Sequence, residues 1–256
     1  MVSELFSLSG KVILVSGGYG YLGKSITLGL AEHGAKVVVL GRSKQKFDDV
    51  FNFPDIYFFE MDISSSESVK ECFASIFQQF GRIDVLINNA FYSRGNDPEK
   101  MTDEDWSFGV DGNLNSTFRC IREIIPYFKQ NKNGRIINVA SMYGMVSPDF
   151  KVYENNNFLN PPHYGAAKAG VIQMTKYYAC YLGKYNILVN CVSPGPFPSE
   201  MVQENEEFIA NLKAKNPLGR IGTPDDLKGV FVLLSSDASK FITGQNFAVD
   251  GGWTAW

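Results

Sequence analysis

The sequence has 256 residues, of which 45% are hydrophobic and 20% are charged, and its formal net charge at pH 7 is −3. A chain of this length and apolar content can bury the core of one α/β domain, so we expect a single domain over residues 1–256. The sequence has no basic surplus and its Lys and Arg residues are scattered, which argues against a nucleic-acid partner.

The start of the sequence lacks the cationic and apolar regions of a secretory signal, and no apolar run is long enough to span a membrane. A cytoplasmic protein with no membrane partner is therefore expected. The four cysteines form no CxxC pair, and we expect them to be small buried hydrophobic residues. The only two histidines are His33 and His163. No metal site is expected, and a Ser-His-Asp hydrolase is disfavoured.

Short runs rich in Val and Ile alternate with longer amphipathic stretches along the sequence. This alternation is typical of a parallel sheet that helices cover on both faces. The expected strands are residues 11–16, 36–40, 56–60, 83–88, 135–140, 187–193 and 246–250. Helices are expected to begin near Tyr21, Ser66, Asp103, Pro161, Glu200 and Pro224. The sequence therefore predicts an α/β fold, a doubly wound, Rossmann-like parallel sheet of about seven strands and about six helices.

The first expected strand leads directly into a glycine-rich stretch, and a helix follows. In that context glycines let the backbone turn tightly and approach a pyrophosphate, which the free N–H groups and dipole of the helix start stabilise. The stretch therefore predicts a dinucleotide site, although a tight turn without a ligand is the alternative interpretation. The residues assigned to this site are Ser16, Gly17, Tyr19, Gly20, Tyr21, Leu22 and Gly23.

The end of the second expected strand indicates which dinucleotide is preferred. An acidic residue there would accept hydrogen bonds from the adenosine ribose, but the sequence has Gly41 followed by Arg42, Ser43 and Lys44. A guanidinium suits a 2′-phosphate, so NADP(H) is favoured as the cofactor and NAD(H) stays possible. The alternative is that Arg42 and Lys44 are solvated loop charges.

Tyr164 and Lys168 lie four residues apart, on one face of the helix that Pro161 and Pro162 introduce. A phenol has a reference pKa of about 10 and is a poor general base at neutral pH. A neighbouring ammonium lowers that pKa by stabilising the phenolate, and a positively charged nicotinamide would lower it further. The pair is therefore a candidate acid/base site.

Residues 145–163 are too rich in Asn and Pro for a helix or a central strand, so we expect a long loop. Long loops in compact domains are usually functional or disordered. The loop offers polar groups more than aliphatic ones, which favours a polar substrate such as a sugar or a hydroxy acid. A subunit contact or a mobile lid is the alternative interpretation.

Six further motifs follow in a fixed order: IDVLINNA, GNLNSTF, RIINVASMYG, YGAAK, SPGPFPS and ITGQNFAVDGG. Together they resemble the short-chain dehydrogenase/reductase family, in its single-domain branch, from end to end of the sequence. The resemblance implies direct hydride transfer between a nicotinamide and a carbonyl or alcohol, without a metal.

The resemblance also implies a role for each matching residue. Tyr164 would be the general acid/base, Lys168 would lower its pKa and hold the nicotinamide ribose, and Ser141 would bond the reacting oxygen. Asn113 would anchor a water that leads protons to Lys168. The further residues that the resemblance places at the cofactor are Asp62, Ile63, Asn89, Ala90, Pro194, Gly195 and Ser199.

The sequence departs from the family pattern at several positions. Ser16 stands where the family has Thr, Tyr21 where it has its middle glycine, and Ser199 where it usually has Thr. Phe91 follows the NNA motif in place of glycine, so its ring is expected to narrow the site or to pack beneath the cofactor. Residues 145–163 include an insertion, which has to begin and end at the active site.

Residues 200–222 occupy the place of the family's variable substrate lid. Their apolar residues recur with helical spacing, so we expect an amphipathic helix that covers the site. Within it, Met201, Phe208 and Leu212 are expected to serve packing more than substrate recognition.

The resemblance further implies a homo-oligomer, a tetramer or a dimer, with the last strand and the carboxyl-terminal tail near a subunit interface. The tail carries Trp253 and Trp256. Two exposed tryptophans would be unusual at the end of a monomer, and burial against a neighbouring subunit would explain them.

The leading hypothesis is an NADP-preferring carbonyl reductase or alcohol dehydrogenase that acts on a polar, sugar-like substrate, in surface-glycan or flagellin-sugar synthesis. One alternative is a sugar-nucleotide epimerase or dehydratase, because the glycine spacing GxxGxxG resembles that branch. Against it, the sequence ends soon after the last expected strand. A second alternative is a noncatalytic nucleotide-binding protein, which would not need Ser141, Tyr164, Lys168 and Asn113 together.

Overall fold

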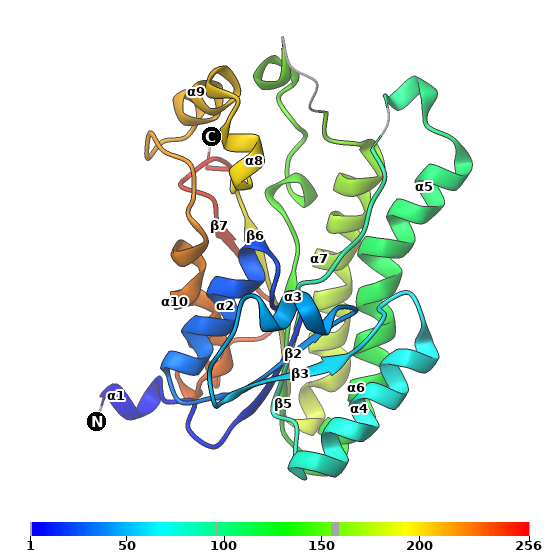
Figure 1. Ribbon diagram of the computed structural model, residues 1–256, viewed down its shortest axis with the longest axis vertical. Coiled ribbons are helices and arrows are strands. Elements are labelled where there is room, and N and C mark those ends of the chain that lie inside the picture. The colour runs from blue at the N-terminus through cyan, green and yellow to red at the C-terminus, as the bar shows by residue number, and fades with distance from the viewer. Residues whose placement is uncertain (1, 96, 155–158, 256) are drawn as a thin grey trace.

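The core of the protein is a parallel sheet in the strand order β3-β2-β1-β4-β5-β6-β7. The computed structural model describes residues 2–95, 97–154 and 159–255 (Figure 1). The order confirms the predicted doubly wound α/β fold, and each strand begins and ends within two residues of its expected bounds. The strands are β1 (Val12–Ser16), β2 (Lys36–Gly41), β3 (Ile56–Glu60), β4 (Val85–Asn88), β5 (Gly134–Val139), β6 (Ile187–Pro194) and β7 (Asn246–Val249).

Helices begin at or within one residue of five of the expected positions, and the segment expected from Pro224 begins as a 3₁₀ turn, Pro224–Leu227, that continues into a helix. The expected helix from Glu200 is broken in two, because the side chain of Asn205 caps a new start by accepting the Phe208 N–H at 3.0 Å. The helices are α1 (Val2–Leu5), α2 (Tyr21–Glu32), α3 (Lys44–Asp48), α4 (Ser66–Phe80), α5 (Asp103–Val110), α6 (Ser116–Asn131), α7 (Pro162–Leu182), α8 (Glu200–Gln203), α9 (Glu206–Lys215) and α10 (Lys228–Ser235).

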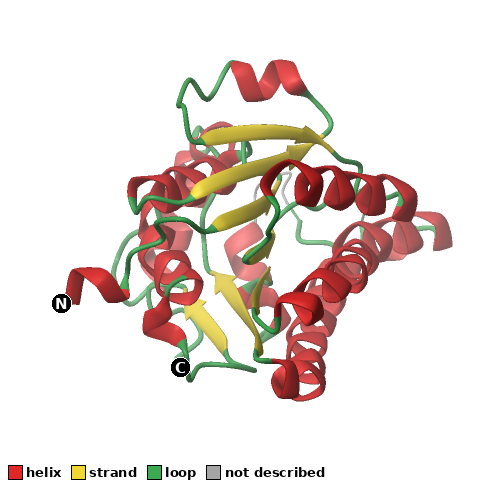
Figure 2. Ribbon diagram, turned by 90° about the horizontal axis from the view of Figure 1, so that it is seen from below, coloured by secondary structure: helices red, strands yellow, loops and turns green. Residues whose placement is uncertain are grey.

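Helices cover both faces of the sheet, which Figure 2 shows from below. Val12 and Leu14 of β1 pack in a core cluster with residues of α4, α6 and α7. Ile13 and Val15, which point to the other face, pack with residues of α2 and α10. Because successive side chains of a strand alternate between the faces, burial on both faces explains why the strands read as continuous apolar runs.

Strand order reverses at β1, which pairs with β2 on one side and with β4 on the other. The connections after β1 and β4 therefore leave toward different parts of the sheet, and a crevice forms at the carboxyl ends of these strands. Ser16 joins the two strand ends across this point. Its Oγ accepts the N–H groups of Asn89 and Ala90, each at 3.0 Å, and donates to the Ile87 carbonyl at 3.3 Å.

Three side chains lie in environments that differ from the expected ones. Cys180 is exposed on α7, although the other three cysteines are buried as expected. Met201 is 78% exposed, because α8 is a single turn and the apolar stripe of α9 does not continue through it. Trp253 is only 3% exposed within the chain itself, so it needs no neighbouring subunit to bury it. Trp256 lies outside the described residues.

Among the residues that the structure describes, none of the helices combines the length and the apolar character needed to cross a lipid bilayer.

We expect Ser16→Ala to lower the free energy of unfolding by about 1–3 kcal/mol, because two backbone N–H groups at the strand reversal would lose their acceptor. Ser16→Thr keeps the hydroxyl acceptor and should therefore lose less stability than Ser16→Ala. Urea denaturation measures both. Equal stability of Ser16→Ala and the unsubstituted protein would show that the hydroxyl does not join the strands.

Candidate active site

A cavity of about 550 Å³ opens at the carboxyl ends of the strands, where the strand order reverses. The lining brings together most of the residues that the sequence assigned to the cofactor and to catalysis. These are Gly17, Tyr19, Gly20, Tyr21, Leu22, Gly23, Arg42, Asp62, Ile63, Asn89, Ala90, Ser141, Tyr164, Lys168, Pro194, Gly195 and Ser199.

Three assigned residues do not line the cavity. Ser16 is buried behind the glycine-rich turn, and Ser43 caps α3 by accepting the Lys46 N–H. Asn113 is buried in a π-helical turn between α5 and α6, where its Nδ2 donates to the Gly109 carbonyl at 2.9 Å. Its Oδ1 is buried and finds no hydrogen-bond partner among the described residues. Such an atom suits the implied role of holding a water.

The glycine-rich turn has no room for side chains at its centre. A Cβ at Gly23 would lie 2.2 Å from the Gly17 carbonyl oxygen, and Gly17 itself has a φ of +65°. Gly20 precedes α2, and no side chain of the described residues caps the helix there, so its first N–H groups can bind an anion. The backbone here is built to approach a ligand closely.

Two tyrosines flank this turn. The ring of Tyr19 lies against Gly41, where an added Cβ would be 2.5 Å from the phenol oxygen. Tyr21, which stands in place of a family glycine, accepts a hydrogen bond at 3.2 Å from Nε2 of Gln203 in α8. The side chain of Tyr21 therefore connects the glycine-rich turn to the segment after β6.

One end of the cavity carries two cations, with the Asp62 carboxylate also in the lining. Arg42 lines it as expected, but Lys44 forms an ion pair with Asp48 at 2.6 Å. Lys46, which the sequence analysis missed, lines the cavity in its place. The signal that could have found it is helical spacing, because Lys46 lies in the first turn of a short helix that Ser43 caps.

Ser141, Tyr164 and Lys168 meet at the opposite end. Ser141 lies two residues after the end of β5. Pro161 and Pro162 start α7, so that its first two turns carry Tyr164 and Lys168. The Lys168 ammonium nitrogen lies 5.6 Å from the centre of the Tyr164 ring.

The electrostatics of this group follow from its burial. Burial lowers the pKa of Lys168 to about 8, and its ammonium donates to the Val139 carbonyl at 2.9 Å. Burial raises the pKa of Tyr164, and its hydrogen bond with Ser141 acts in the opposite direction. At neutral pH Tyr164 is therefore a phenol, ready to donate a proton, beside a cation that burial holds close to its titration point.

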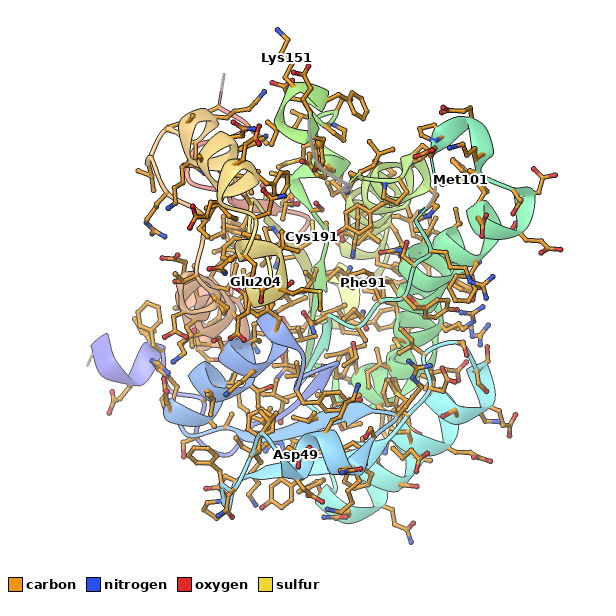
Figure 3. The ribbon with its side chains drawn as sticks, turned by 45° about the horizontal axis from the view of Figure 1, so that its top comes forward. Asp49, Phe91, Met101, Lys151, Cys191 and Glu204 are labelled. Atoms are coloured by element: carbon orange, nitrogen blue, oxygen red, sulfur yellow. The ribbon has the colours of Figure 1, made fainter. Side chains whose placement is uncertain are left out.

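Phe91 lines the cavity beside this group and is labelled near the centre of Figure 3. Its ring is 54% exposed, with its centre 6.0 Å from that of Tyr164 and 5.3 Å from the Lys168 nitrogen. The ring therefore lies in the cavity beside the acid/base pair, a position from which it could narrow the site or pack beneath a bound cofactor.

The described part of the insertion folds back as a 3₁₀ turn, Phe150–Tyr153, which carries Lys151 at the top of Figure 3. At the end of the insertion, His163 is fully buried and its Nε2 bonds the Arg94 carbonyl at 2.8 Å, which ties the loop after β4 to α7. Residues 155–158, which include the three consecutive asparagines, lie outside the described residues.

The expected lid segment packs on the insertion. Phe208 and Leu212 are buried, as expected, in a cluster with Met142, Val152 and Trp253. Among residues 200–222, all of which the structure describes, none lines the cavity, whose lining stops just before α8 at Ser199.

Comparisons with known proteins agree with this arrangement. A family model described as enoyl-(acyl carrier protein) reductase matches residues 21–254. The 3-oxoacyl-(acyl-carrier-protein) reductase FabG of Thermotoga maritima is 35% identical over 251 residues, which is 96% of this chain and 98% of that protein.

Solved structures match over nearly the whole chain. A short-chain dehydrogenase from Leptospira borgpetersenii with bound NAD+ is 32% identical, with a TM-score of 0.87 over 99% of this chain and 96% of that chain. A gluconate 5-dehydrogenase from Burkholderia cenocepacia in complex with NADP and tartrate is 26% identical, with a TM-score of 0.87 over 100% of both chains. With its strand order, its cavity and its Ser-Tyr-Lys group, the chain belongs to the short-chain dehydrogenase/reductase family of NAD(P)-dependent oxidoreductases.

Proposed function

We propose that the protein is an NADP(H)-preferring carbonyl reductase or alcohol dehydrogenase whose substrate is polar and sugar-like. One observation carries this proposal: a single cavity has Ser141, Tyr164 and Lys168 at one end and the cations Arg42 and Lys46 at the other. The structure of the gluconate dehydrogenase, with NADP and tartrate, supports a polar substrate by analogy. Surface-glycan or flagellin-sugar synthesis is the pathway class that the sequence resemblance suggests.

A second candidate is reduction of a 3-oxoacyl group, because the Thermotoga maritima relative is a 3-oxoacyl-(acyl-carrier-protein) reductase. A direct assay with acetoacetyl-coenzyme A and NADPH separates the two candidates. Higher kcat/KM for that thioester than for hydroxylated ketones would favour the second.

The cavity fits a dinucleotide. Its volume of about 550 Å³ lies within the usual range of cofactor sites, and the turn around Gly17 and Gly23 keeps side chains away from the place of a pyrophosphate. In the proposed complex the free N–H groups of α2 hold the pyrophosphate. Arg42 and Lys46 hold a 2′-phosphate on the adenosine ribose.

When bound, the nicotinamide supplies or accepts the hydride. Tyr164 donates its phenolic proton to the substrate oxygen during reduction, and Ser141 donates a hydrogen bond to the same oxygen as negative charge develops. Lys168 holds the nicotinamide ribose, and its positive charge favours the phenolate that Tyr164 becomes. Asn113 holds the water through which Lys168 returns a proton to Tyr164.

We also propose that the protein is a homo-oligomer that uses the outer faces of α6 and α7. Phe118, Tyr177 and Tyr181 expose between 40% and 63% of their surface there, and the Tyr177 and Tyr181 rings stack with their centres 6.2 Å apart. Grouped exposed apolar side chains mark interaction surfaces. Sedimentation velocity should give a dimer or a tetramer at micromolar concentration. A monomer would contradict the proposal.

Arg42→Ala and Lys46→Ala should each weaken NADPH binding by about tenfold or more, because each removes a charge-assisted contact to the 2′-phosphate. NADH binding should change little. Lys44→Ala is the matched control and should leave both affinities unchanged, since Lys44 pairs with Asp48. Titration of the cofactor fluorescence measures all three variants. An equal loss for NADH and NADPH would overturn the assignment of the 2′-phosphate site.

Tyr164→Phe should lower kcat for ketone reduction by about 10²–10⁴-fold while NADPH binding stays unchanged, because only the proton donor is lost. An initial-rate assay of NADPH consumption measures kcat, and fluorescence titration measures NADPH binding. Full activity of Tyr164→Phe would refute the assignment.

The pH profile provides an independent check on the same site. Lys168 is a cation below its pKa of about 8 and neutral above it, so kcat/KM for reduction should fall as pH rises through this value. The raised pKa of Tyr164 keeps its proton in place over the same range.

A further inference from the structure

Tyr143 is fixed next to the proposed catalytic serine. Its N–H donates to Oγ of Ser141 at 3.2 Å, and it belongs to a 3₁₀ turn, Met142–Gly144, that follows β5. This turn packs closely on α7, because a Cβ at Gly165 would lie 2.9 Å from the Tyr143 carbonyl oxygen. Tyr143 therefore lies against the part of α7 that carries the proposed acid/base pair.

Tyr153 comes from the insertion and meets Tyr143. The two phenol oxygens are 2.6 Å apart and share one hydrogen bond. The Tyr153 ring centre lies 5.4 Å from that of Phe208 in α9, and an ion pair between Asp149 and Lys215 ties the same turn of the insertion to α9. Contacts from two segments, the turn that carries Tyr143 and helix α9, thus hold the Tyr153 side chain in position.

The paired hydroxyls keep unused hydrogen-bonding capacity. Two phenols have two O–H donors, and the bond between them uses one. Within residues 2–95, 97–154 and 159–255, neither hydroxyl has another hydrogen-bond partner in the protein. One O–H and several lone pairs therefore stay available to a ligand. Both tyrosines are half-buried in the free protein. Covering their hydroxyls with a ligand is costly unless the ligand satisfies them.

The Tyr143 end of the pair lies beside the proposed catalytic group, because the Tyr143 backbone contacts both Ser141 and Gly165. Burial raises the pKa of Tyr143 above its ordinary value, with Tyr153 and Tyr164 adding to the shift. Burial also raises the pKa of Tyr153, so both phenols are neutral at physiological pH. A neutral donor and acceptor in this position match a neutral hydroxyl, which can donate and accept in turn.

We propose that the hydroxyls of Tyr143 and Tyr153 form a second polar subsite, which binds a hydroxyl that the substrate carries close to the reacting carbonyl. The inference rests on the proposed reductase function and narrows its substrate class to hydroxylated ketones and the corresponding diols. A site built to bond a hydroxyl discriminates against the analogue that lacks it, because its polar groups then stay unpaired. Through Tyr153, the insertion would thereby set the preference for hydroxylated ketones over ketones that lack the hydroxyl.

The test compares 2-hydroxycyclohexanone with cyclohexanone, two ketones that differ by the one hydroxyl, in NADPH-consumption assays. The unsubstituted protein should prefer the hydroxy ketone. Tyr153→Phe should lower kcat/KM for the hydroxy ketone about tenfold, equivalent to about 1.4 kcal/mol, and leave cyclohexanone within about twofold. Tyr143→Phe should show the same difference between the two ketones, since either substitution removes the hydrogen bond between the two phenols.

Tyr178→Phe is the matched control, because this tyrosine lies farther along α7 than the proposed acid/base pair, packs against the core cluster and should change neither substrate. NADPH titration and thermal melting of each variant check that the fold and the cofactor site are intact. An equal loss on both ketones, or no loss on the hydroxy ketone, would overturn the subsite while the reductase function stands. Reduction of neither ketone by the unsubstituted protein would overturn both proposals.

Discussion

The reversal of strand order between β1 and β4 is the constraint on which the arrangement of the site depends. A parallel sheet that is buried on both faces has few places for polar side chains except at the ends of its strands. The reversal opens a crevice at one of these ends. Ser16 holds the ends of β1 and β4 together there, because its Oγ accepts hydrogen bonds from the first two residues after β4. The glycine-rich turn, the cationic end and the acid/base pair all lie around this crevice.

Much of the fold could be predicted because the sheet is buried on both sides. Its strands are nearly continuous apolar runs, and helices begin after capping residues or at prolines, as Ser65 and Pro162 illustrate. The same logic places the candidate site, since residues that follow parallel strands come together at one edge. Tyr164 and Lys168 were predictable as a pair because one helical turn separates them.

The features that could not be predicted depend on contacts between segments far apart in the sequence. The partner of Tyr153 is set by how the insertion packs on α9, which no local pattern reveals. Trp253 is buried by the same cluster, whereas the family resemblance placed it near a subunit interface. Lys46 replaces Lys44 in the cavity because a capped helical turn rotates one side chain inward and lets the other pair with Asp48.

The lining of the cavity comes from the loops after six strands, β1 to β6, and so from both halves of the sheet. Those halves meet directly along β1 and β4, whose register extends only from Ile13 to Val15. A dinucleotide bound across the β1–β4 pairing would stabilise the folded protein, because a ligand that binds only the folded state shifts the folding equilibrium by mass action. At a concentration one hundred times its dissociation constant, such a ligand adds about 2.7 kcal/mol to stability. The folded population of the protein is thereby coupled to the supply of its cofactor.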